Sequence, residues 1–142
     1  MRILVPIDGS AAAQRALTHA LAILGGHQDG LLILLNVQSA ETLDVSDISG
    51  VMSAAHDRKL AARRSARALR ESRAMCRAAG THYETRAELG PVAETINRLA
   101  RELRADQIVM GTRGHGAIGR LFLGSVATKV VELASVPVTL VK

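Results

Sequence analysis

The chain has 142 residues and a mass of 15.0 kDa, the size of one domain spanning 1–142. Hydrophobic residues make up 48% of it and charged residues 22%, which excludes a disordered chain. The net charge of +5 favours an acidic ligand, but with one Tyr and one Phe the chain has no platform on which single-stranded bases could stack.

Short apolar runs alternate with amphipathic helical stretches from the start of the chain. Arg2–Ile7 predicts a buried strand, and Ser10 predicts the N-cap of a helix that ends at Gly25. Leu31–Val37 is almost continuously apolar, which predicts a second strand covered on both faces. The polar segment Ser39–Ser53 predicts a loop.

The same alternation continues in the second half. Ala54–Ala79 predicts the longest helix, and the more polar Thr81–Ala87 predicts a strand near an edge of the sheet. Pro91 is expected at the first position of the next helix, and Asp106–Met110 predicts a fourth strand. The last predicted elements are a helix capped by Ser125 and an edge strand over Val136–Val141.

Strands that alternate with helices predict an α/β fold. The order βαβαβαβαβ requires right-handed crossovers between parallel strands, with helices on both faces. We therefore expect a doubly wound, five-stranded parallel sheet, whose strand order the alternation alone does not give.

A glycine-rich loop follows the fourth predicted strand. Residues 111–124 hold five glycines between the carboxyl end of a strand and the start of a helix, where ligands bind in open α/β sheets. Glycines let backbone N–H groups converge on an anion, and the helix N-terminus adds further donors. Arg113 and Arg120 supply positive charge, and Ser125 could cap the helix or donate its hydroxyl to a phosphate. The pattern favours a phosphate site.

The alternative interpretation is a flexible loop whose glycines only permit turns. The loop is not a Walker A motif, because Gly-Lys-Ser/Thr occurs nowhere in the chain. It also follows the fourth strand, whereas the dinucleotide-binding fingerprint follows the first.

Three segments together resemble the universal stress protein family. The spacing Gly-x2-Gly-x9-Gly-Ser over 111–125 is similar to the nucleotide-binding signature of that family. Ile3–Ser10 resembles its first strand and turn, and Ser135–Val138 resembles its last strand. Length and element order also match, so the resemblance covers the whole chain.

The resemblance implies a strand order of 3-2-1-4-5, which would bring Asp8 opposite Gly111. It implies ATP or another adenine nucleotide as a regulatory ligand, with Mg²⁺ possible at Asp8 through water. The nucleotide-binding residues that it implies are Pro6, Ile7, Asp8, Val37, Met110, Gly111, Arg113, Gly114, His115, Gly116, Gly124, Ser125 and Val126.

We expect hydrolysis of the nucleotide to be slow or absent. The loop offers backbone donors and arginines but no lysine, and Asp8 is the only acid that can be placed nearby. The five histidines have no ligand spacing that would predict a transition-metal site. A slow ATPase or phosphotransferase is the alternative, which release of phosphate from Mg-ATP would reveal.

The predicted long helix is strongly basic. Residues 58–77 hold eight of the 18 Lys and Arg residues. On the helical wheel, basic side chains are predicted on one side (Arg63, Arg67, Arg70, Arg77) and small or apolar ones on the other (Ala62, Ala66, Leu69, Cys76). The basic side is either a solvated outer face or a docking surface for an acidic partner or nucleic acid. Any binding of nucleic acid is expected to lack sequence specificity. The third hypothesis is an interaction protein that uses this helix, residues 58–77, independently of nucleotide.

Targeting and association signals are few. No apolar run approaches the ~18 residues that span a bilayer, and the first run meets Asp8 too early for a signal peptide. A single cysteine, Cys76, excludes an internal disulfide. We therefore expect a soluble, cytoplasmic protein without a membrane partner. The uncharged strand 138–141 is compatible with the homodimer that the family resemblance implies.

Overall fold

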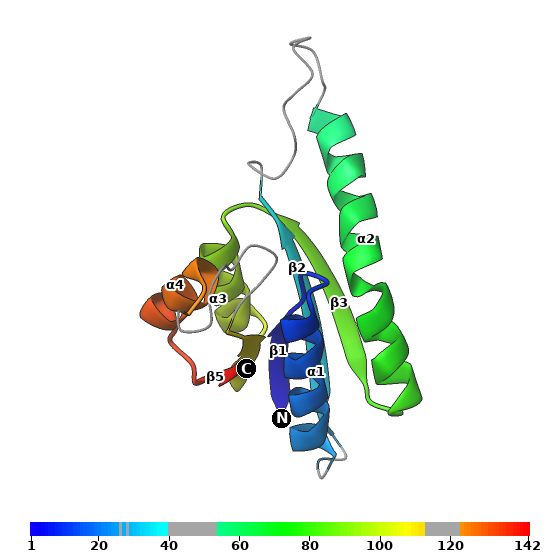
Figure 1. Ribbon diagram of the computed structural model, residues 1–142, viewed down its shortest axis with the longest axis vertical. Coiled ribbons are helices and arrows are strands. Elements are labelled where there is room, and N and C mark those ends of the chain that lie inside the picture. Colours follow the sequence, from blue (N-terminus) through cyan, green and yellow to red (C-terminus); the bar gives the residue numbers. More distant parts are fainter. Residues whose placement is uncertain (26, 28, 40–53, 113–122) are drawn as a thin grey trace.

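Strands and helices alternate along the chain, as Figure 1 shows. The computed structural model describes residues 1–25, 27, 29–39, 54–112 and 123–142, so the predicted loop, apart from Ser39, lies outside the described residues. The elements are β1 (Arg2–Pro6), α1 (Ala11–Leu24), β2 (Leu31–Gln38), α2 (Ala54–Ala78), β3 (Tyr83–Leu89), α3 (Val92–Glu102), β4 (Gln107–Gly111), α4 (Ser125–Leu133) and β5 (Val138–Val141).

The strands form one parallel sheet in the order β3-β2-β1-β4-β5. Helices α1 and α2 cover one face, and α3 and α4 cover the other (Figure 1). This confirms the predicted doubly wound α/β fold, the strand order and both edge strands. The order reverses between β1 and β4, which makes their carboxyl ends the place where such sheets bind ligands.

The core has two layers, one on each face of the sheet. Ile3 and Val5 of β1 pack toward α1 and α2, whereas Leu4 between them packs toward α3 and α4. In β2, Leu34 and Ile33 divide in the same way. All five side chains are fully buried, which explains why these strands are apolar at successive positions.

The ends of the helices follow local capping chemistry. The Oγ of Ser10 accepts a hydrogen bond from the N–H of Ala13 at 3.2 Å, which confirms the predicted N-cap of α1. Gly25 is the C-cap of the same helix. Pro91 was expected inside α3 but is its N-cap, because its ψ of 124° is extended and helical geometry begins at Val92.

The buried stripe of α2 differs from the predicted one. Ala62 and Ala66 are exposed, so their placement on the core side was wrong. The buried positions are Ala61, Ser65, Leu69, Ser72 and Cys76. Two serines can face the core because the Oγ of Ser65 donates to Asn36 and that of Ser72 donates to Gln14.

Cys76 belongs to this stripe, as predicted, and its side chain is fully buried. Burial raises the pKa of the Cys76 thiol to about 11, although the positive charge of Arg77 acts in the opposite direction. The residue is therefore a neutral, unreactive thiol at physiological pH.

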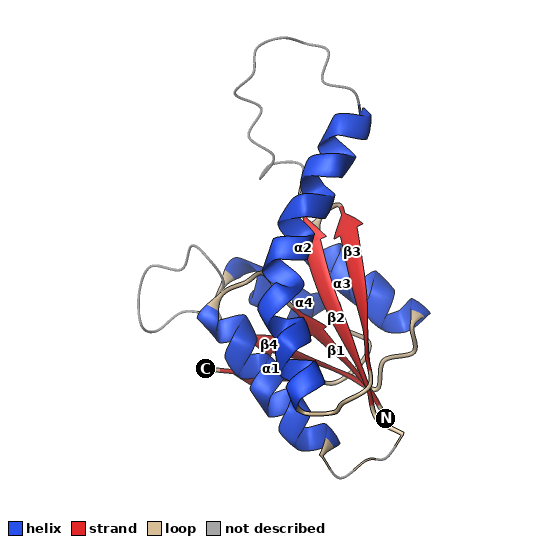
Figure 2. Ribbon diagram, turned by 90° about the vertical axis from the view of Figure 1, so that its right-hand side faces the viewer, coloured by secondary structure: helices blue, strands red, loops and turns tan. Residues whose placement is uncertain are grey.

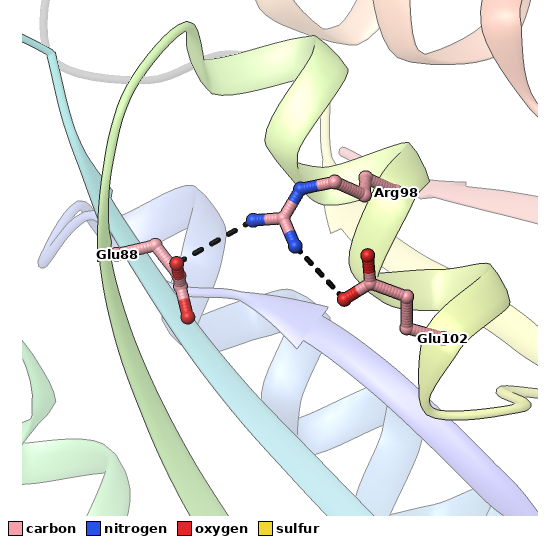
Figure 3. A network of polar contacts seen from close by, with 3 residues as sticks. All are labelled: Glu88, Arg98 and Glu102. Atoms are coloured by element: carbon pink, nitrogen blue, oxygen red, sulfur yellow. Dashed lines mark hydrogen bonds and ion pairs between the residues drawn. The ribbon is translucent and has the colours of Figure 1, made fainter.

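The two edges of the sheet carry different side chains. On β3, Glu84 pairs with Arg86 at 3.1 Å. Arg98 of α3 reaches Glu88 of the same strand at 3.4 Å and Glu102 of its own helix at 2.8 Å, as Figure 3 shows. The other edge, β5, has no charged residue in its four positions. None of the described helices is long and apolar enough to cross a membrane.

Candidate functional site

The carboxyl ends of β1 and β4 lie next to each other at the centre of the sheet (Figure 2). Ile3 pairs with Gln107 and Leu4 with Ile108. Continuing this register sets Ile7, and not Asp8, at the level of Gly111. The expected juxtaposition of the two segments is therefore correct to within one residue.

The end of β1 presents its backbone to this region. The side chain of Ile7 is only 2% exposed and packs in the layer beneath α1 and α2, so it is unavailable to a ligand. The Ile7 N–H donates to the carbonyl of Leu35 at 2.7 Å. Its carbonyl accepts from the Nδ2 of Asn36 at 2.6 Å, and the half-buried Pro6 precedes it.

Asp8 is exposed in the turn between β1 and α1. Its Oδ1 accepts a hydrogen bond from the N–H of Ser10 at 2.9 Å, and Gly9 between them has a φ of 85°, which suits glycine. The carboxylate is thus oriented by the turn and lies at the carboxyl edge of the sheet.

A cluster of polar side chains, which was not predicted from the sequence, bonds the backbone of Ile7 just before this turn. Asn36 is 2% exposed, and its Oδ1 accepts from the Oγ of Ser65 and from the Nε2 of Gln38, both at 2.7 Å. One side chain therefore connects the end of β1 with β2 and α2. The signal in the sequence was an asparagine near the end of an otherwise apolar strand. Its neighbour Val37 is half-buried and packs toward α3 and α4.

At the end of β4, Gly111 makes a close backbone approach. A Cβ at this position would lie 2.8 Å from the Cβ of Ala12 and 2.9 Å from its carbonyl carbon. Glycine is therefore required at this position by the packing of α1 on β4. Met110 is 5% exposed in the opposite layer, so its side chain belongs to the core.

The two ends of the glycine-rich loop are joined at its base. The N–H of Gly124 donates to the carbonyl of Thr112 at 2.8 Å, and the N–H of Thr112 donates to Val141 of β5 at 2.9 Å. The predicted site residues Arg113, Gly114, His115 and Gly116, together with Arg120, lie outside the described residues.

Helix α4 begins directly after the hydrogen bond between Gly124 and Thr112. Its N-cap is Gly124, with ψ at 152°, and Ser125 is already helical, so the prediction that Ser125 caps the helix was wrong. Glycine has no side chain with which to cap, and the N–H groups of the first turn therefore keep their capacity to bind an anion. The side chains of Ser125 and Val126 are exposed at this end.

The described residues contain no group of three His, Cys, Asp or Glu side chains that could hold a metal ion. The site that the described residues define is therefore made of backbone donors and acceptors, one carboxylate and one serine hydroxyl. Such a set suits a ligand with phosphate and hydroxyl groups.

Two solved structures of this fold contain adenine nucleotides. A universal stress protein in complex with cAMP is 25% identical, with a TM-score of 0.69 over 99% of this chain and 95% of that chain. A universal stress protein family protein from Arabidopsis thaliana with AMP bound has the same TM-score of 0.69 at 20% identity, over 100% of this chain and 91% of that one.

Sequence and structure comparisons agree on the family. UspA from Lactobacillus plantarum is 30% identical, with a TM-score of 0.73 over 100% of this chain and 97% of that one. A universal stress protein of Thermus aquaticus is 57% identical over 53 residues, 37% of this chain and 39% of that protein. One from Methanocaldococcus jannaschii is 31% identical over 144 residues, 99% of this chain and 81% of that protein. The model of the universal stress protein family matches residues 1–142, and the chain therefore belongs to this family.

Proposed function

We propose that this chain binds ATP, or another adenine nucleotide, as a regulatory ligand at the carboxyl edge between β1 and β4. The observation that carries the proposal is the start of α4. The first turn of this helix has no side-chain cap at Gly124. The helix begins directly after the hydrogen bond from Gly124 to Thr112, which joins the two ends of the glycine-rich loop. The family structures that contain cAMP and AMP support an adenine nucleotide as the ligand.

The ligand would be bound mainly through the backbone. Adenine and ribose would contact the end of β1 at Pro6, Ile7 and Asp8, with Val37 beside the base. The ribose and phosphates would be held by Gly111, Arg113, Gly114, His115, Gly116, Gly124, Ser125 and Val126. Asp8 would hold Mg²⁺ mainly through water, since Mg²⁺ dehydrates reluctantly and keeps several waters where the protein offers one carboxylate.

Hydrolysis is proposed to be slow or absent. Asp8 is the only carboxylate in the segments 6–8, 110–112 and 124–126, and its Oδ1 already accepts the Ser10 N–H. Release of phosphate faster than about one per second would reach ordinary enzyme rates and would favour the alternative of an ATPase or phosphotransferase.

The first prediction concerns Gly114, the central glycine of the loop signature. We expect wild-type protein to bind about one ATP per chain in calorimetric titration, since the chain carries one copy of the signature. Gly114→Val is expected to weaken this binding at least tenfold, because a branched side chain would keep phosphate from the backbone donors.

The matched control is Gly25→Val at the exposed C-cap of α1, where an added Cβ would make only ordinary contacts at 3.5 and 3.6 Å. This variant should bind ATP as the wild type does. Wild-type protein free of co-purified nucleotide that shows neither heat nor a thermal shift with ATP would contradict the proposed function.

We also propose that the chain forms a cytoplasmic homodimer through β5. The support is the uncharged edge strand Val138–Val141, in which the side chain of Leu140 is 36% exposed. Leu140→Asp is expected to shift the sedimentation coefficient from that of a dimer to that of a monomer. The Arg86→Asp variant at the opposite edge should remain dimeric, and a wild-type monomer at high concentration would contradict the proposal.

A further inference from the structure

The positive charge of this protein is concentrated on one helix. Helix α2 contains eight of the 18 Lys and Arg residues but only two of the 13 Asp and Glu residues. The helix therefore carries a charge of +6, and the rest of the chain carries −1. The basic character of the protein is a property of α2 alone.

The cations of α2 form a straight stripe on its outer face. Lys59, Arg63, Arg67, Arg70 and Arg77 are all exposed and, at 100° per residue, fall within about 80° of one another. The stripe extends about 27 Å along the helix axis. It lies opposite the buried positions from Ala61 to Cys76, so the sheet holds the helix with the stripe facing outward.

Arg77 of the stripe donates a hydrogen bond to the hydroxyl of Tyr83 at 3.2 Å, but no carboxylate in the described part of the chain pairs with a cation of the stripe. The salt bridges there join Arg86, Arg98 and Lys129 to glutamates, and none of them involves a cation of the stripe. Lys59 and Arg67 each lie four residues from Arg63, a spacing at which like charges destabilise a helix. The cations of the stripe thus lie close together, and no described carboxylate forms a salt bridge with any of them.

The composition of the stripe points to phosphate groups. Seven of the eight basic residues of α2 are arginines, whose planar guanidinium groups bind phosphate oxygens through two parallel hydrogen bonds. Alanines at 62, 66, 74 and 78 are also exposed beside the stripe and let an extended polyanion approach closely. The exposed Glu71 lies about 40° from Arg67 on the helical wheel and borders the stripe on that side.

The same composition argues against other polyanions. The stripe has no Leu, Phe or Trp with which to enter a membrane surface, and no aromatic residue on which single-stranded bases could stack. It also lacks Trp and Tyr, two of the three residue types (with Arg) that dominate the binding energy of protein interfaces.

We propose that the outer face of α2 binds the phosphate backbone of double-stranded nucleic acid, without sequence specificity. Duplex nucleic acid presents the densest regular array of phosphates, and binding it needs only a row of cations. The N-terminal part of α2 extends beyond the ends of the strands in both views (Figures 1 and 2), which gives a long duplex access to the helix. The surface is separate from the proposed nucleotide site and does not depend on it.

The test is fluorescence anisotropy with a labelled DNA duplex of about 20 base pairs, which is longer than the stripe. If all five cations contact phosphates, the slope of log K against log salt concentration is about −4.5, and affinity falls about 500-fold between about 50 and about 200 mM salt. The triple variant Arg63→Gln, Arg67→Gln, Arg70→Gln is expected to weaken binding at least tenfold at low salt and to bring the slope to about −1.8.

The control is the triple variant Arg86→Gln, Arg101→Gln, Arg104→Gln, which removes the same charge from exposed positions elsewhere. It should change the affinity less than twofold, and circular dichroism should show both triple variants folded. Equal weakening by the two triple variants would overturn the proposal, because net charge alone would then explain binding. No duplex binding at low salt would also overturn it, as would tighter binding to phosphatidylserine vesicles or displacement of the duplex by polyglutamate at equal charge.

Discussion

Gly111→Ala is expected to lower the free energy of unfolding by about 3 kcal/mol, at the upper end of the range for overpacked cores. The new methyl group would lie 2.8 Å from the Cβ of Ala12, 2.9 Å from its carbonyl carbon and 3.0 Å from its oxygen. Two of these atoms belong to the backbone of the first turn of α1, so no rotamer change can relieve the contact. Urea denaturation followed by circular dichroism measures the effect.

Gly25→Ala is the matched control for this substitution. An added Cβ there makes contacts of 3.5 and 3.6 Å, and the φ of −58° suits any residue. This variant should stay within about 0.5 kcal/mol of the wild type or gain slightly, because alanine reduces the entropy of the unfolded chain. An unchanged urea midpoint in Gly111→Ala would show that α1 does not pack on β4 as closely as the structure has it.

Asn36→Ala is expected to lower the free energy of unfolding by about 4 kcal/mol and to weaken binding of adenine nucleotide. The substitution leaves the Ile7 carbonyl without the Asn36 Nδ2, and leaves the buried Ser65 hydroxyl without its acceptor. Each buried polar group that loses its partner costs about 1–3 kcal/mol. The backbone around Ile7 would also lose the contact that fixes it beside the proposed site. Urea denaturation and calorimetric titration measure the two effects.

Two serines of α2 provide controls for Asn36. Ser65→Ala keeps the bond from Asn36 to Ile7 and the bond from Gln38, so about 1 kcal/mol and little affinity should be lost. Ser72→Ala removes a comparable buried hydroxyl that bonds Gln14 of α1 and makes no bond to Asn36 or Ile7, so it should leave nucleotide affinity unchanged. If Asn36→Ala proves no worse than Ser65→Ala, the bond to Ile7 contributes little and the positioning argument fails.

Most of the fold could be predicted from the sequence because its elements have clear periodicity. The apolar run from Leu31 identified β2, and Ser10 marked the start of α1 to the residue. The polar strand β3 was placed two residues early, at Thr81, because its alternation extends into the turn before it. Strand order came only from the family resemblance, since long-range pairing leaves no mark in local periodicity.

Most of the errors occurred where contacts between residues distant in the sequence decide a position. Ser65 takes a core position on α2 because Asn36, 29 residues earlier, accepts its hydroxyl. Apolarity alone favoured Ala62 and Ala66, which are exposed. The need for glycine at position 111 was attributed to a ligand, whereas contact with Ala12 already requires it. Ser125 was expected to be a cap because serine is a common cap, but Gly124 takes that place.

The unlike edges of the sheet determine how copies of this chain can assemble. The β3 edge carries Glu84, Arg86 and Glu88, which oppose the addition of another strand, whereas β5 carries no charge. Two copies that pair through β5 would each use the uncharged edge strand that is open to pairing. The joined sheet would then end in the charged strand β3 on both sides. Growth would stop at that point, because no free edge would remain to recruit a third copy. If the chain dimerises through β5 as proposed, the charges on β3 would therefore make assembly self-limiting and would protect the sheet from extending into a fibre.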